Sequence, residues 1–198
     1  MTRKTSLSNG CRGTNELFGR VVGSGFNVGL DPFGDQFLVY ADGYKLAADT
    51  VVQNLRGSKQ VLVFPICYLY RHYLELMIKG LTRLAYAILN GKILYSDGHK
   101  LTELWEECRA LLEKVMPQWP KTDFNNVGEC IQAFASFDFD GEFPRYPEDR
   151  KRHPWPQPVD DINLQRMSKT VSAVADLLDC YYYEMDNRLK CAAEAASY

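Results

Sequence analysis

The sequence predicts an all-α fold, a bundle of about five helices with an irregular N-terminal arm and a long proline-rich loop before the last helix. Apolar residues recur every three or four positions in five segments, whereas the alternation typical of strands is weak throughout. The 198 residues, 46% of them hydrophobic and 24% charged, suffice for one globular core. We expect the arm over residues 1–36 and a single helical-bundle domain over 37–198, with the loop at 138–159.

The first two helices follow from their apolar stripes and their stop signals. The first is expected over residues 37–56, with Gly57 as its stop. The second, over 60–90, carries the broadest apolar stripe of the chain. Pro65 lies in its first turns or kinks a longer helix, and Gly91 ends it. This second helix is therefore the clearest helix prediction in the chain.

Three charged residues on the second helix are spaced four apart: Arg71, Glu75 and Lys79. Side chains four positions apart are neighbours on a helix surface. The spacing predicts ion pairs along a second face of this helix.

The remaining three helices are expected over residues 97–115, 123–137 and 160–190. Thr122 or Asp123 is the candidate N-cap of the middle one, since both side chains can accept a hydrogen bond from the first turn. Helical patterns thus account for most of the chain between residue 37 and residue 190.

The bulk composition limits the partners and the compartment. The net charge of −2 means that any nucleic-acid binding needs a local basic patch. The opening MTRKTSLSNG lacks a signal-peptide pattern, and no run approaches eighteen apolar residues. None of the six cysteines forms a C-x-x-C pair, and Cys67, Cys108, Cys130 and Cys180 fall on or beside apolar stripes. We expect a cytoplasmic protein with no membrane span, no cofactor and buried, inert thiols.

Two segments resemble the HEPN superfamily of prokaryotic helical-bundle proteins: YLYRHYLELMIKGLTRL and GHKLTELWEEC. The matching positions are Arg71, His72, Glu75, Leu76 and Lys79, followed by His99, Leu101 and Leu104. The later FPRYP is similar to an F-R-Y-P turn of some relatives, with Pro144 inserted. The similarity covers roughly residues 60–180.

The resemblance implies a bundle of four or five helices, often dimeric, in defence or toxin–antitoxin systems. Its active members are metal-independent RNA endonucleases whose Arg and His are separated by four to six residues. Seven residues separate Arg145 from His153, two separate Arg150 from His153, and Arg71 directly precedes His72. The expected function is therefore a HEPN-like module that dimerises or binds a partner protein, with RNA contact. The alternative is an endoribonuclease that uses Arg145 and His153.

The loop sequence FPRYPEDRKRHPWPQP, residues 143–158, supplies the residue types of such chemistry. His153 could act as general base or acid, and Arg145 could stabilise a phosphorane. The candidate RNA-binding residues are Arg150, Lys151, Arg152 and Trp155. Five of the nine prolines lie here, which predicts a largely extended path and a stiff connector with a solvated charge run.

Arg145 is flanked by Phe143 and Tyr146, which favours an inward orientation. A buried Arg needs an anion, and Glu75 lies midway along the most apolar helix. The sequence thus predicts a structural Arg145–Glu75 ion pair.

Two further groups of residues are candidates for a binding role. His72, Glu75 and His99 have the composition of a two-His, one-carboxylate metal site, but bundle sites use more carboxylates, and His99 is expected to be a cap or surface residue. The run Tyr181–Tyr183 fits either a dimer interface or the rim of the core.

Overall fold

The computed structural model describes residue 25 and residues 35–57, 59–92, 94, 97–137, 148, 151–154 and 161–195. Five α-helices fall in these ranges: α2 (Gln36–Gln53), α3 (Lys59–Asn90), α4 (Leu101–Val115), α5 (Lys121–Phe137) and α6 (Leu164–Ala195). No strand occurs among the described residues, and the predicted all-α bundle is confirmed. The chain divides into two compact units, Met1–Pro32 and Phe33–Tyr198, and all five helices belong to the second.

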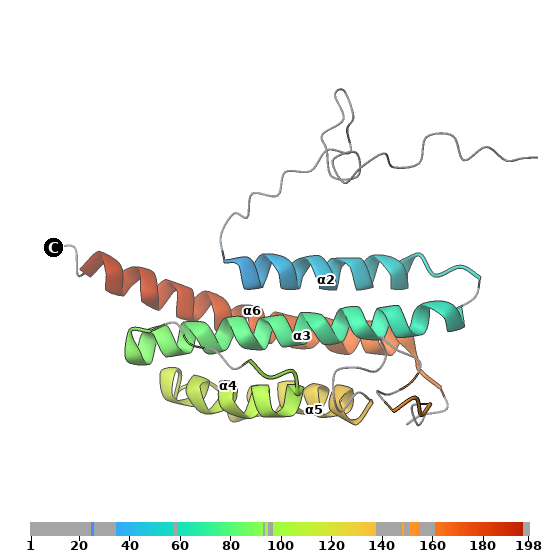
Figure 1. The fold of residues 1–198 in the computed structure, drawn as a ribbon. Helices are drawn as coiled ribbons and strands as arrows, with labels where there is room; N and C mark the ends of the chain where they lie inside the picture. Colours follow the sequence, from blue (N-terminus) through green and yellow to red (C-terminus); the bar gives the residue numbers. More distant parts are fainter. Residues whose placement is uncertain are drawn as a thin grey trace, which may run out of the picture. The chain divides into compact units, whose positions relative to one another are not determined.

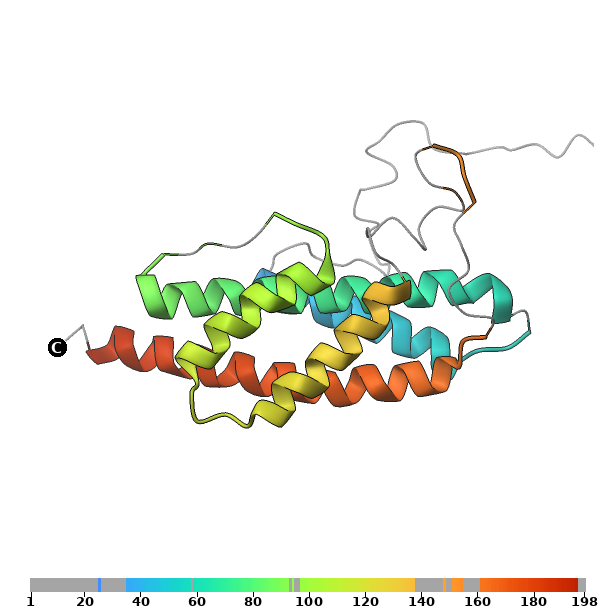
Figure 2. The ribbon, with the colours of Figure 1, turned by 90° about the horizontal axis from the view of Figure 1, so that it is seen from below.

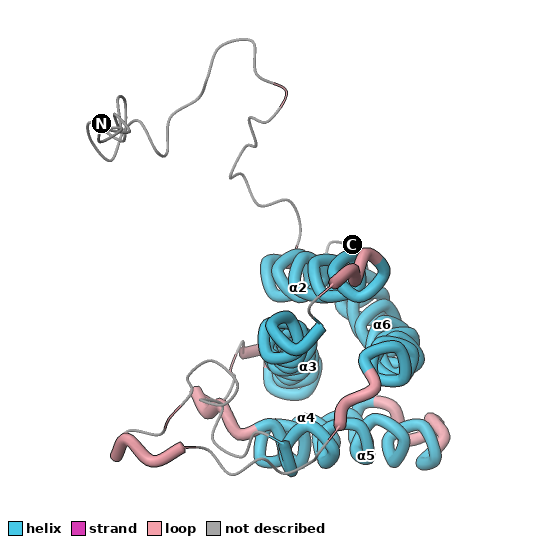
Figure 3. The backbone as a smooth tube through the Cα atoms, turned by 90° about the vertical axis from the view of Figure 1, so that its right-hand side faces the viewer, coloured by secondary structure: helices cyan, strands magenta, loops and turns pink. Residues whose placement is uncertain are grey.

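The helices of this unit lie in three layers (Figures 1 and 3). The helix α3 contacts α2, α4 and α6, and α6 also contacts α2 and α5. The α3–α6 pair therefore lies in the middle, with α2 on one side and α4 and α5 on the other. Figure 2 shows α4 and α5 crossing α3 and α6 obliquely.

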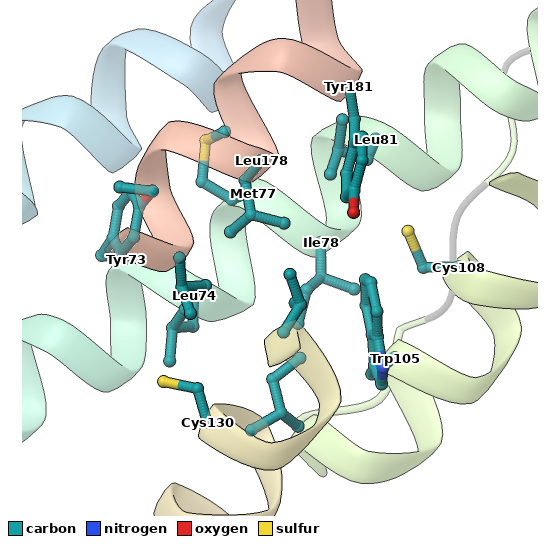
Figure 4. Packing of buried hydrophobic residues seen from close by; sticks show 14 of the residues in the cluster. Tyr73, Leu74, Met77, Ile78, Leu81, Trp105, Cys108, Cys130, Leu178 and Tyr181 are labelled. Atoms are coloured by element: carbon teal, nitrogen blue, oxygen red, sulfur yellow. The ribbon is translucent and has the colours of Figure 1, made fainter. Parts of the chain in front are cut away.

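The core fills the space between α3, α6 and the α4–α5 pair (Figure 4). Leu74, Ile78 and Leu81 of α3 are fully buried, as is Leu178 of α6. Their spacing places them on one face of each helix, as the apolar stripes predict. Tyr181 adds an aromatic contact, with its ring centroid 5.2 Å from that of Phe124. Burial of these stripes against one another is the main favourable contribution to the fold.

One helix of the described part of the chain, α3 from Val61 to Asn90, is long and apolar enough to cross a membrane by length and composition alone. Half of its most apolar window is buried inside the bundle. The core helix of a helical bundle meets the same criterion, and the contacts of α3 with three other helices account for its composition.

The helix boundaries differ from the predictions mainly at the N-terminal ends. The cap of α2 is Asp35, whose side chain accepts a hydrogen bond of 2.8 Å from the Phe37 amide. The prediction of Thr122 or Asp123 as the cap of α5 is wrong, because α5 begins at Lys121 and includes both. The Asp123 amide instead donates to the Pro120 carbonyl. The turn that starts at Pro120 begins the helix before either candidate cap residue is reached.

The described part of the proline-rich loop reverses direction. Glu148 and Pro154 form an isolated antiparallel bridge, and Arg152 between them has a φ of 64°. A positive φ departs from extended backbone, so the predicted extended path does not hold at Arg152. The rest of the loop, and residues 1–24 and 26–34 of the predicted arm, lie outside the described residues.

A partly buried polar contact joins α2, α3 and α6. Asp49 of α2 accepts hydrogen bonds from the Tyr70 hydroxyl at 2.6 Å and the Ser168 hydroxyl at 3.2 Å, and it pairs with Lys45 at 2.8 Å. Burial is the largest influence on the pKa of Asp49 and raises it, but the hydrogen bonds outweigh burial and hold the pKa below its ordinary value. The charged form of Asp49 therefore stabilises the contact between the three helices.

Tyr70 and Tyr73 provide a matched pair for testing this contact. Both are buried on α3, but within the described residues the Tyr73 hydroxyl has no hydrogen-bond partner. We expect Tyr70→Phe to lower the free energy of unfolding by about 1.5–3 kcal/mol, because it removes a hydrogen bond to a charged group. We expect Tyr73→Phe to be neutral or stabilising. Urea denaturation of both variants measures the difference, and equal losses would contradict the assignment.

Candidate functional site

The most prominent polar cluster surrounds Glu75, midway along α3. Its side chain is only 4% exposed. Arg71, one turn before it, donates from Nη1 to Oε2 at 2.8 Å, and Lys79, one turn after it, donates from Nζ to Oε1 at 2.9 Å. The two cations are almost as buried as the carboxylate, at 3% and 10% exposed. The pairing predicted from the four-residue spacing is confirmed, and it lies inside the bundle.

His99 completes the cluster from the segment that precedes α4. Its Nδ1 lies 2.8 Å from Glu75 Oε1, and its backbone carbonyl accepts a hydrogen bond of 2.6 Å from Arg71 Nη2. The imidazole remains 69% exposed. Of the two expectations for His99, a cap or a surface residue, the exposed side chain confirms the second, whereas the N-cap of α4 is Lys100. No pattern in the sequence connects positions 24 residues apart.

The charge of the buried carboxylate is compensated by its neighbours. Burial is the largest single influence on the pKa of Glu75 and raises it. The hydrogen bonds from Lys79, His99 and Arg71 act the other way, and together they hold this pKa below its ordinary value. A buried carboxylate is tolerated when every oxygen is hydrogen-bonded to a cation, and here both oxygens are.

The bonding pattern limits the chemistry of this cluster. A carboxylate that hydrogen-bonds one nitrogen of a histidine fixes the orientation of the ring. The guanidinium of Arg71, by contrast, is directed at Glu75 and at the backbone of His99. These contacts tie the segment before α4 to the middle of α3. The arrangement is that of a structural clamp with one exposed imidazole.

His72 lies on a different side of α3 from this cluster. Its ring stacks on Tyr68, with centroids 5.6 Å apart, and meets the edge of Tyr44 of α2 at 4.4 Å. The three-residue set His72, Glu75 and His99 is therefore not brought together. Over the part of the chain that is described, no group of three His, Cys, Asp or Glu residues is arranged to hold a metal ion.

The predicted loop site is only partly within the described residues. Lys151, Arg152 and His153 are exposed. Arg145, Arg150 and Trp155 lie outside the described residues, so the roles assigned to them remain predictions.

The predicted Arg145–Glu75 ion pair also remains a prediction. In the described structure Glu75 already has three partners, namely Arg71, Lys79 and His99.

The cysteines and the tyrosine run follow the predictions in part. Cys67, Cys108 and Cys130 are buried, and burial raises the pKa of their thiols to about 12, 12 and 11. Cys180 was expected beside the core and is exposed, because its position on α6 points away from the stripe. In the tyrosine run, the first two members are buried and Tyr183 is 61% exposed.

No family model, curated protein or solved structure matches this chain. The contacts of the molecule itself are therefore the basis for its proposed function.

Glu75→Gln tests the importance of the clamp. Removing the anion leaves two cations buried without their counter-charge, so we expect the free energy of unfolding to fall by about 3–5 kcal/mol. The control is Glu103→Gln, which breaks the exposed Lys100–Glu103 pair and is expected to cost less than about 1 kcal/mol. Chemical denaturation measures both variants, and a small loss for Glu75→Gln would show that the cluster is dispensable.

The acid dependence of stability should follow from the same carboxylate. The pKa of Glu75 is lower in the folded protein than in the unfolded chain. Ionised Glu75 therefore adds to the free energy of unfolding above the unfolded pKa of about 4.3, and this contribution is lost as the pH falls through the folded pKa.

Asp179 should have the opposite effect. Burial raises its pKa, and nearby Asp42 and Asp176 raise it further, so its ionised form destabilises the fold at neutral pH. We expect Glu75→Gln to flatten the acid limb of the stability curve and Asp179→Asn to increase stability at pH 7. Denaturation between about pH 2 and pH 8 checks both signs.

Proposed function

We propose that this chain is a HEPN-like helical module of a prokaryotic defence or toxin-type system, and that it acts by dimerisation or by binding a partner protein. The proposal rests on one observation: the charges of the central helix are paired in the interior, whereas large apolar side chains are exposed on the surface. The charged residues of the central helix, Arg71, Glu75 and Lys79, hydrogen-bond to one another in the interior. Large apolar side chains are exposed on α2, with Tyr40 at 59% and Leu46 at 68%. Exposed apolar groups favour protein contacts.

RNA contact through the proline-rich loop is part of the proposal. Three consecutive residues of basic type, Lys151, Arg152 and His153, are exposed within the described part of the loop. Such a run can contact phosphates even in a chain with a net charge of −2. The same exposure supports the alternative function, a metal-independent endoribonuclease in which His153 exchanges protons and Arg145 stabilises the transition state.

Incubation of the purified chain with single-stranded RNA in the presence of EDTA separates the two functions. The binding module predicts intact RNA, and a salt-sensitive mobility shift that is weakened by Lys151→Ala with Arg152→Ala. The endoribonuclease predicts cleavage that is lost in the Arg145→Ala, His153→Ala variant. Cleavage with that dependence would overturn the proposed function, and cleavage that persists in the variant would indicate a contaminating nuclease.

A further inference from the structure

The imidazole of His99 is held at one nitrogen and exposed at the other. Its Nδ1 lies 2.8 Å from Glu75 Oε1, whereas the side chain as a whole is 69% exposed. The backbone of this residue is fixed as well, because its carbonyl accepts a hydrogen bond of 2.6 Å from Arg71 Nη2. Within the described part of the chain, Nε2 has no hydrogen-bond partner. The ring is therefore held in one orientation, with Nε2 directed away from the carboxylate.

The charge of Glu75 decides which nitrogen of His99 carries the hydrogen. Burial raises the pKa of Glu75, but its hydrogen bonds outweigh burial and lower the pKa, so the carboxylate is ionised at neutral pH. An ionised carboxylate can only accept hydrogen bonds, so Nδ1 of His99 must be the donor. A neutral imidazole carries one N–H, which leaves a lone pair on Nε2. The contact with Glu75 therefore fixes the tautomer whose nucleophilic nitrogen is the exposed one.

We propose that Nε2 of His99 is a phosphoryl-acceptor site, and that its donor carries the phosphoryl group on nitrogen, as a phosphohistidine of another protein does. In this step the Nε2 lone pair forms a bond to phosphorus. The P–N bond of the donor breaks, and its electron pair goes to the leaving nitrogen, which takes up a proton from water. One P–N bond replaces another, so the step needs no co-reactant beyond the donor. The inference does not depend on whether the chain binds a partner protein or RNA.

The buried carboxylate favours the product of this step. Attack by Nε2 leaves the ring positively charged, because Nδ1 keeps its hydrogen. A carboxylate hydrogen-bonded to the other nitrogen stabilises an imidazolium as it forms, and Glu75 already lies 2.8 Å from Nδ1. Since the Glu75 side chain is only 4% exposed, water screens its interaction with the ring weakly. Glu75 is thus a positioning residue, and His99 is the residue that is modified.

The surroundings of His99 suit a phosphoryl group. The hydrogen-bonded side chains near the ring include more cations than carboxylates, namely Arg71, Lys79 and Lys100 against Glu75 and Glu103. The helix α4 begins two residues after His99, and the N-cap side chain makes no hydrogen bond to its first turn. The positive end of the α4 dipole is therefore close to the ring, where it favours a negative group.

Reaction of the full chain with phosphoramidate tests the proposal, at about pH 8, where imidazole side chains are ordinarily neutral. Intact-mass measurement gives the rate, and fragmentation of the modified chain locates the phosphoryl group. The matched control is a synthetic peptide of residues 97–103, DGHKLTE, which keeps the charges next to His99 and lacks Glu75 and Arg71. We expect His99 to react at least about tenfold faster in the folded chain, a factor typical of a residue that orients a histidine.

His72 is the internal comparison in the same experiment. Its half-buried ring stacks on Tyr68 and meets the edge of Tyr44, with centroids 5.6 and 4.4 Å away. Aromatic rings on two sides restrict the approach of a donor, so we expect His72 to remain unmodified while His99 reacts.

Nitrogen-15 NMR of the imidazole tests the premise separately, because it reports which nitrogen carries the hydrogen. We expect the Nδ1–H form of His99 in the folded chain and both forms in the peptide. This readout distinguishes positioning by Glu75 from a purely structural role, which would leave the tautomer unselected.

Any of three results would overturn the inference. A rate in the folded chain no greater than that of the peptide would show that Glu75 does not activate the ring. A phosphoryl group found mainly on His72 or His153 would place the reactive nitrogen elsewhere. An Nε2–H form of His99 in the folded chain would remove the lone pair on which the step depends. All three would leave the proposed function standing.

Discussion

The hydrogen-bonded carboxylate of Glu75 is the contact on which the centre of this bundle depends. Because α3 packs against α2, α4 and α6, every charge on its middle turns must be compensated inside the protein. Arg71 and Lys79 supply that compensation from the same helix. Through His99 the carboxylate also fixes the segment that leads into α4. One buried anion therefore joins the pairing along α3 to the segment that precedes α4.

A second carboxylate, the partly buried Asp49, links α2, α3 and α6 by hydrogen bonds. Asp49 pairs with Lys45 and accepts a hydrogen bond from Ser168 of α6, so these charged residues of α2 lie on the side that faces α6. The helix is then left with an outer face that has no charge to satisfy and apolar groups that remain in contact with water. The functional proposals follow from this asymmetry, since interior charges are used for structure and the exposed apolar surface is available for binding.

The sequence was sufficient for the helices and for the pairing of Arg71, Glu75 and Lys79, because periodicity and four-residue spacing are local properties of a helix. The sequence grouped Glu75 with His99 only as part of a possible metal site, and the hydrogen bond between them depends on how α4 packs on α3. The start of α5 and the turn at Arg152 were missed for a related reason. The helix start after Pro120 and the positive φ of Arg152 both depend on the surrounding backbone, and residue type alone does not determine them.

A double-mutant cycle between Arg71 and Glu75 tests most directly whether the cluster is a single structural unit. Arg71→Met, Glu75→Gln and the double variant are compared with the parent by urea denaturation at neutral pH. If the two side chains stabilise the fold by acting on each other, the coupling energy will be about 1–3 kcal/mol, and the double variant will be more stable than the two losses predict when summed. Losses that add within about 0.5 kcal/mol would contradict the account, because they would mean that each charge is compensated independently of the other.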